Sequence, residues 1–182
     1  SILHAELDAN VVLATETLLE GGALWMKGGG VIHAPELTTL KDMAVYLSGG
    51  GSFVTPNLVD VDGSSFDLSG PTTSYVLPAV ITSYQAGDSF GDRYFQVDDH
   101  AMLDLTSLAT LAPNTAGRSL AFYAYGGGTL LLPNVSEFSD ISVHVRAQDD
   151  GSYIDLSGLT QWAGRDPTRG ERSSLTSAPN TT

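Results

Sequence analysis

The 182-residue sequence contains no cysteine. A disulfide framework, a thiolate metal site and a cysteine nucleophile are therefore excluded, whereas secretion is not. Basic residues are scarce too: 8 Lys and Arg stand against 21 Asp and Glu, for a formal net charge of −13. Nucleic acids and anionic membranes are bound through clustered positive charge, so neither is expected as a partner.

Long apolar runs are also missing. No stretch approaches the ~18 uninterrupted apolar residues of a membrane span, so no membrane insertion is predicted. The chain begins at Ser1 within patterned sequence and without a leader signature, and we expect a mature product or a segment of a longer protein. Apolar residues still make up 42% of the chain, which is enough for a core.

An internal repeat is the main positive signal. Residues 23–37, 44–58 and 121–135 share one order: an apolar run, three glycines, a second apolar run and Pro-x-apolar. Four divergent units, with Asp, Asn, Gly or Pro at the turn, cover 3–18, 65–80, 93–108 and 143–159. The positions aligned between units are spaced by 21, 22, 27, 28 and 23 residues, which is typical of solenoids. They are Pro35, Pro56, Pro78, Leu105, Pro133 and Leu156.

The apolar runs are short, rich in Val, Leu, Tyr and Phe, and bounded by residues that tolerate positive φ, which are strand and turn signals. Apolar pairs three apart, such as Leu37 and Leu40, indicate a bend and a third strand. We therefore predict an all-β fold, a right-handed parallel β-helix of about seven coils with three short strands per coil, over residues 1–162. Residues 163–182 lack the pattern and are predicted to form a polar tail or linker.

Residues 126–135 (GGGTLLLPNV) and 151–160 (GSYIDLSGLT) look like degenerate repeats of a known kind. With the units around them, about residues 3–162, they resemble the repetitive β-solenoid regions of bacterial surface and adhesin-like proteins. The resemblance implies a structural or adhesive role and an extracellular or cell-surface location. It transfers no functional residues to this chain.

One aromatic column is predicted on the outside of a sheet. Its neighbours along each strand are apolar, so strand alternation places the column outward. Exposed aromatic rings can stack on sugars, although the same ladder can simply stabilise the sheet. The column holds Trp25, Tyr46, Asp67, Tyr123 and Arg146, with Tyr94 joining if its coil shifts by one. The candidate ligand-binding residues are Trp25, Tyr46, Tyr94, Tyr123 and Arg146.

A second apolar column leaves two alternatives open. It comprises Ile32, Phe53, Tyr75, Met102, Leu130 and Tyr153, and the neighbouring positions are apolar as well. Either one of the two columns forms a hydrophobic outer surface for a partner, or a loop covers it. Two longer connections, 85–92 and 112–118, are expected to protrude close together, as binding loops or as neutral insertions.

Acidic turns are the candidate metal sites. Asp98, Asp99, Asp149 and Asp150 offer oxygen ligands that suit Ca²⁺, although Asp in a turn usually serves the backbone. Among possible catalytic pairs, Asp104 and Asp155 share a column but lie two coils apart, about 9.6 Å.

No catalytic motif is present, and no catalytic residue is predicted. We expect a non-enzymatic structural or adhesive module; the alternative is a carbohydrate-binding, even polysaccharide-degrading, β-helix. The expected partners are a polysaccharide, another protein domain, or copies of the chain joined end to end or laterally. No cofactor is expected, and Ca²⁺ is the one candidate that the acidic turns leave open.

Overall fold

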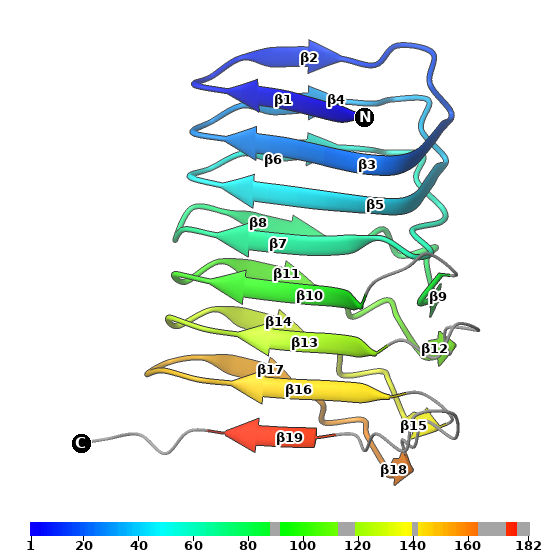
Figure 1. Ribbon diagram of the computed structural model, residues 1–182, viewed down its shortest axis with the longest axis vertical. Coiled ribbons are helices and arrows are strands. Elements are labelled where there is room, and N and C mark those ends of the chain that lie inside the picture. Colours follow the sequence, from blue (N-terminus) through cyan, green and yellow to red (C-terminus); the bar gives the residue numbers. More distant parts are fainter. Residues whose placement is uncertain (88–91, 113–118, 140–141, 164–173, 178–182) are drawn as a thin grey trace.

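The computed structural model describes residues 1–87, 92–112, 119–139, 142–163 and 174–177. These residues form strands and turns only, and the strands stack in parallel as a β-solenoid of about six turns, close to the seven predicted (Figure 1). Strands in front run to the left and those behind run to the right as the chain descends, so the winding is right-handed (Figure 1). The predicted fold class is confirmed.

Each turn of the solenoid, here called a coil, has three faces. The first face is one eight-stranded parallel sheet of β1 (Ile2–Glu6), β3 (Leu18–Lys27), β5 (Thr39–Ser48), β7 (Ser65–Ser69), β10 (Arg93–Asp98), β13 (Leu120–Ala124), β16 (Val143–Ala147) and β19 (Ser174–Ser177). The second face holds β2 (Asn10–Val12), β4 (Val31–His33), β6 (Ser52–Val54), β8 (Ser74–Val76), β11 (Met102–Asp104), β14 (Thr129–Leu131) and β17 (Tyr153–Asp155). The third face holds β9 (Ser83–Gln85), β12 (Thr110–Ala112), β15 (Glu137–Ser139) and β18 (Gln161–Ala163).

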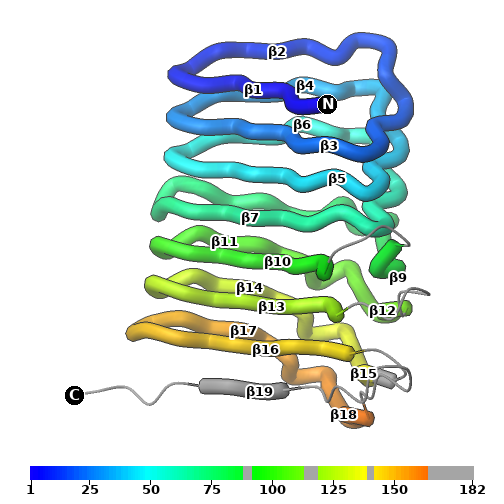
Figure 2. Tube along the Cα trace, in the orientation of Figure 1, coloured from blue at the N-terminus to red at the C-terminus, as the bar shows by residue number. Residues whose placement is uncertain are grey.

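Three separate strands per coil are present from β7 to β18. Earlier, the third face of one coil and the first face of the next form one continuous strand, β3 or β5, each 10 residues long. The bend inside these strands falls at Gly21 and Asp42, which both have positive φ. Figure 2 shows the coils lying level, one below another, along the axis.

The register follows the predicted period. On the first face Ala23 pairs with Ala44, and Ala44 pairs with Ser65, so the first coils repeat every 21 residues. Pairing of Phe66 with Phe95, and of Phe95 with Phe122, stretches the period to 29 and then 27 residues. The insertions responsible leave the third face on adjacent coils, as expected, because β9 and β12 pair with each other. The centres of these connections, 88–91 and 113–118, lie outside the described residues.

The alignment from sequence is wrong by one residue in the coils of β11 and β17. Val76 pairs with Asp104, and Asp104 pairs with Leu131, so Pro78 lies level with Thr106 rather than with Leu105. Those coils have Thr106 and Ser157 where the others have proline, and the apolar residue just before each of them was aligned with the proline instead. As a result Met102 and Tyr153 are exposed, and their places in the inward column are taken by Leu103 and Ile154.

Stacked rings run through the core. Phe66, Phe95 and Phe122 follow one another at centroid distances of 5.9 and 5.6 Å with planes 8° apart. Tyr84, fully buried on the third face, meets Phe95 edge-on at 5.1 Å. Rings in such arrangements attract one another beyond their apolar burial, so each coil stabilises the next.

The glycine triplets form the turns between the first and second faces, as predicted. The first two glycines have positive φ, for example 55° and 80° at Gly49 and Gly50, and Asp99 and His100 adopt the same conformation in their coil. At the third glycine, Gly51, a Cβ would lie 2.2 Å from the carbonyl oxygen of Met26, so close stacking of coils excludes any side chain there.

Part of the predicted polar tail joins the solenoid. Ser174–Ser177 form β19, which pairs in parallel with β16. The rest of the tail after Ala163 lies outside the described residues.

Candidate functional site

The predicted aromatic column exists on the outside of the first face. Strand pairing aligns Trp25, Tyr46 and Asp67, and further along the axis it aligns Gln96, Tyr123 and Arg146. The column position on β10 is therefore Gln96, and the conditional placement of Tyr94 in this column is wrong. The turn after β10 begins at Asp99 rather than at Asp98, since Asp98 pairs within the sheet with Ser69, and Asp99 and His100 have the positive φ of the first two glycines elsewhere. A count of three residues back from Asp98 therefore missed Gln96.

Tyr94 reaches the same region by another route. Its own column contains small residues, Ala44, Ser65 and Ala121, which leave room for its ring. The Tyr94 hydroxyl lies 3.3 Å from the hydroxyl of Tyr46, two coils away. Burial, reinforced by this hydrogen bond, raises the pKa of Tyr94. Tyr94 therefore holds Tyr46 in place from the side.

The first rings of the column stack on one another. The His4 and Trp25 rings are 5.8 Å apart and 4° from parallel, and Trp25 lies 3.9 Å from Tyr46 at 16°. Both faces of Trp25 are therefore used within the column. The stack stops at Tyr46 because the next column residue, Asp67, is not aromatic.

A groove of about 290 Å³ lies beside this stack, here called the Tyr46 groove. One wall is the column of Trp25, Tyr46 and Asp67, and the other is the next outward column of Lys27, Ser48 and Ser69, with Leu47 also lining it. The two serines are small, which explains the hollow. An aromatic edge thus faces hydroxyl groups across a space open to solvent.

The groove is acidic at one end and basic at the other. Burial, and to a lesser extent the charge of Asp98, raises the pKa of Asp67. Asp98 lies level with Ser69 and extends the same side of the groove. Lys27 is exposed on β3, two coils from Asp67.

Tyr123 and Arg146 form a separate cluster. Tyr123 packs against Tyr125 at 5.8 Å, and the Arg146 guanidinium lies 5.8 Å from the centre of the Tyr125 ring. Arg146 also donates a hydrogen bond to Gln148. Gln96 stands between this cluster and the Tyr46 groove, so the five predicted ligand-binding residues do not form one site. Tyr125 was missed because it directly precedes the turn, in the outward column of Asp98, whereas the predicted column lies two residues earlier on each strand.

The second face shows which of its apolar columns is outward. Ile32, Phe53 and Tyr75 are buried, whereas Val12, Val54 and Val76 are 62%, 39% and 59% exposed. A hollow of about 400 Å³ on this side is lined by Val12, His33, Pro35, Val54 and Pro56. The outward column mixes apolar and polar residues: His33 stands between Val12 and Val54, and Asp104 and Asp155 flank Leu131 further along.

The predicted calcium ligands take part in turns. Asp98 accepts a hydrogen bond from the N–H of Asp99 at 2.7 Å, and Asp149 accepts one from the N–H of Gly126 at 3.3 Å. Gly126 separates the two acidic turns, so Asp99 and Asp149 are about 9.6 Å apart along the axis. The part of the chain that the structure describes contains no group of three His, Asp or Glu residues able to hold a metal. Calcium binding stays a prediction.

Asp104 and Asp155 also serve turns. They flank Leu131 in one column, as expected, and accept hydrogen bonds from the N–H groups of Thr106 and Ser157 at 2.8 and 2.9 Å. This local bonding accounts for both carboxylates without a catalytic role.

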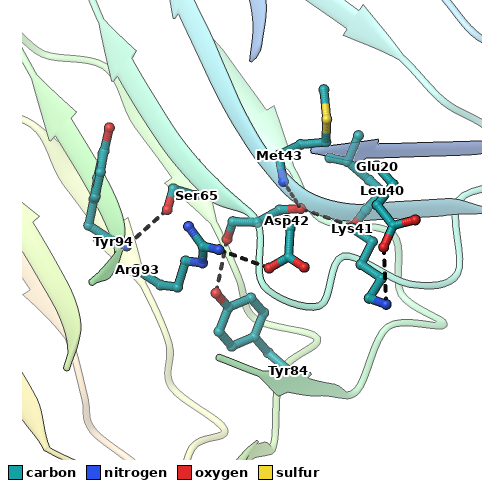
Figure 3. A network of polar contacts seen from close by, with 10 residues as sticks. Glu20, Leu40, Lys41, Asp42, Met43, Ser65, Tyr84, Arg93 and Tyr94 are labelled. Atoms are coloured by element: carbon teal, nitrogen blue, oxygen red, sulfur yellow. Dashed lines mark hydrogen bonds and ion pairs between the residues drawn. The ribbon is translucent and has the colours of Figure 1, made fainter. Parts of the chain in front are cut away.

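A polar clamp that the sequence did not reveal joins the first and third faces (Figure 3). The Arg93 guanidinium lies 2.8 Å from the Asp42 carboxylate, and these side chains are only 14% and 18% exposed. Below them the Tyr84 hydroxyl donates to the Ser64 carbonyl at 3.0 Å. At Gly63 a Cβ would lie 2.3 Å from the Asp42 carboxylate oxygen, so glycine makes room for the ion pair. The partners are 51 residues apart, and no local pattern links them.

No helix in the described residues is long and apolar enough to cross a membrane. Comparison of the chain with protein-family models, with curated proteins and with solved structures found no match.

Proposed function

We propose that this chain is a non-enzymatic adhesive module of a secreted or cell-surface protein, a rigid β-solenoid that holds polysaccharide against its first face. The observation that supports this most directly is the Tyr46 groove, where an aromatic edge faces Ser48, Ser69 and Asp67. Sites for small polar ligands combine apolar walls with a few placed polar groups in this way.

The scaffold favours binding because it fixes the groove before a ligand arrives. Trp25 stacks on Tyr46, the Tyr94 hydroxyl contacts Tyr46 from the side, and the backbone beneath is a continuous sheet. Side chains that are already ordered lose little conformational entropy on binding. A repeated rod also suits a module that carries load between other parts of a surface protein.

A purely structural module is the second candidate. The use of both faces of Trp25 within the column favours it, because those faces then stabilise neighbouring coils instead of binding sugars. The exposed valines of the second face would support lateral packing on another domain or a second copy. In this case the groove would be a by-product of two small serines.

Retention on insoluble polysaccharides separates the two candidates. We expect wild-type protein to be retained by at least one of cellulose, chitin and chitosan, and Trp25→Ala to weaken this retention about tenfold, which corresponds to ~1.4 kcal/mol. Tyr123→Ala is the matched control, since it removes an outward ring of the same column outside the groove. Retention by none of the three, or equal loss in both variants, would refute the adhesive proposal and leave the structural one.

A further inference from the structure

Asp67 is a carboxylate in surroundings that do not suit a charge. It is half-buried, its column neighbours are Tyr46 and Gln96, and burial followed by the charge of Asp98 raises its pKa. Within the described residues no protein group donates a hydrogen bond to its carboxylate. A partly desolvated charge without a partner is unfavourable, and a cationic ligand would relieve it.

The charges around the Tyr46 groove favour a cation only at the end where Asp67 lies. Two charged residues line it, Lys27 from β3 and Asp67 from β7, and Asp98 from β10 lies just beyond the groove, beside Ser69. Lys27 stands two coils from Asp67, about 9.6 Å by strand spacing. An ammonium group would therefore be attracted beside Asp67 and repelled at the far end, which limits the site to one cationic unit.

The remaining lining suits a sugar ring. The volume of about 290 Å³ is just below that of most small-molecule sites, which span roughly 300–1,000 Å³, so the groove suits a small ligand. Trp25 covers one face of the Tyr46 ring, and the opposite face, on the side of Asp67, can attract a cation. The hydroxyls of Ser48 and Ser69 can bond sugar hydroxyls. An aromatic ring beside a carboxylate is a combination that binds an amine more strongly than an uncharged amide.

We propose that the Tyr46 groove recognises an amino sugar, one pyranose ring whose protonated amine lies against Asp67 and whose ring lies along Trp25 and Tyr46. This inference rests on the proposed adhesive function and names the class of sugar that the groove takes. The polysaccharide that carries it is then a partly or fully deacetylated aminoglycan.

Titration calorimetry at pH 6 and 150 mM salt tests the inference with three disaccharides: β-1,4-linked glucosamine, its N-acetylated form and cellobiose. We expect the wild type to prefer the amino disaccharide about tenfold or more, ~1.4 kcal/mol. Asp67→Asn keeps the shape of the side chain and should reduce this preference to near unity. Asp150→Asn, which removes an exposed carboxylate away from the groove, should leave it unchanged.

The other possible outcomes refute either the amino-sugar inference or the adhesive proposal. Equal binding of all three disaccharides, lost in Trp25→Ala, would refute the amino-sugar inference while the adhesive function stands. Preference that survives in Asp67→Asn would place its origin in the net charge of −13 rather than in the groove. Absence of binding to any disaccharide or polysaccharide would refute the adhesive proposal itself.

A readout on the wild-type protein guards against a variant that fails to fold. The amino disaccharide should shift the indole N–H resonance of Trp25, assigned by its loss in Trp25→Ala, and leave that of Trp162 unmoved. An unshifted Trp25 resonance at saturating disaccharide would overturn the inference.

Discussion

Phe95 is the residue whose truncation should destabilise the solenoid most clearly. It is fully buried and contacts three rings: Phe66 at 5.9 Å, Phe122 at 5.6 Å and Tyr84 at 5.1 Å. Truncation of a buried Phe to Ala costs about 3–5 kcal/mol, including the cavity left behind. Because coils above and below both lose a stacking partner, we expect Phe95→Ala to lower the free energy of unfolding by about 4 kcal/mol. Phe95→Leu keeps most of the volume and loses mainly the ring contacts, so about 2 kcal/mol is expected.

Urea unfolding followed by circular dichroism measures these changes. Tyr123→Ala, an outward and half-buried ring, is the control and should lower the free energy by about 1 kcal/mol or less. Repeat proteins can unfold in parts, so if the transitions followed at two wavelengths do not coincide, each transition would be fitted by itself. A smaller effect of Phe95→Ala than of Tyr123→Ala would refute the assignment of the Phe95 column to the core.

Three further predictions concern the polar clamp, the Tyr46 groove and the acidic turns. Gly63→Ala should lower the free energy of unfolding by about 1–3 kcal/mol, because its φ is +67° and its Cβ would meet the Asp42 carboxylate; an unchanged urea midpoint would contradict this. Asp67→Asn should raise the urea midpoint at pH 7. The raised pKa of Asp67 means that the folded state binds a proton more readily than the unfolded state, so the stability of the wild type falls as the pH rises from 3.8 through the folded-state pKa. Near pH 3 Asp67 is protonated in both states, and the difference in urea midpoint between Asp67→Asn and the wild type should vanish. A gain that persists at pH 3 would exclude charge as its cause. Millimolar Ca²⁺ or a chelator should leave the melting temperature unchanged, since Asp149 already bonds a backbone N–H; a rise that Asp149→Asn abolishes would establish a calcium site.

The early coils could be predicted from the sequence almost residue by residue. A constant period of 21 residues and the glycine triplets fix the register there, so alternation alone places Trp25 and Tyr46 outward. Close stacking of coils imposes the third glycine, as the 2.2 Å approach at Gly51 shows. Where close stacking of coils allows only glycine at a position, as at Gly51, that position in the coil can be recognised from the sequence.

The later coils depart from the prediction where the residues that mark a turn or a bend elsewhere are missing. The turn after β10 has no glycine to mark its start, so Asp98 was counted as its first residue instead of Asp99, and Tyr94 rather than Gln96 was placed in the column. Met102 has apolar neighbours, Ala101 and Leu103, so either Met102 or Leu103 could be matched with the apolar residues of the other coils, and the sequence pattern alone does not show that Met102 pairs with Ser74 and Thr129. Only the pairing of whole strands resolves such a register.

The Tyr46 groove and the polar clamp of Arg93 and Asp42 both depend on residues from different coils. Ser48 and Ser69 are unremarkable singly, and their effect arises because they stack beside two aromatic rings. The spacing of 21 residues between them was a usable signal, since it equals the period. No comparable signal links Arg93 to Asp42, because the insertion before β10 breaks the period between them.

Asp67 interrupts the outward aromatic column of the first face. Its inward neighbours, Phe66 and Leu68, are fully buried and continue the core columns without a break. The outward residue between them replaces the aromatic stack of Trp25 and Tyr46 with a half-buried carboxylate, and its raised pKa leads us to expect that this charge lowers stability at neutral pH. Residues that reduce stability in an otherwise consistent sequence tend to serve function. If Asp67→Asn both raises the urea midpoint and removes the preference for an amino sugar, the same charge accounts for both effects. If Asp67→Asn is more stable but binds the amino sugar unchanged, Asp67 only destabilises the aromatic column and has no role in binding.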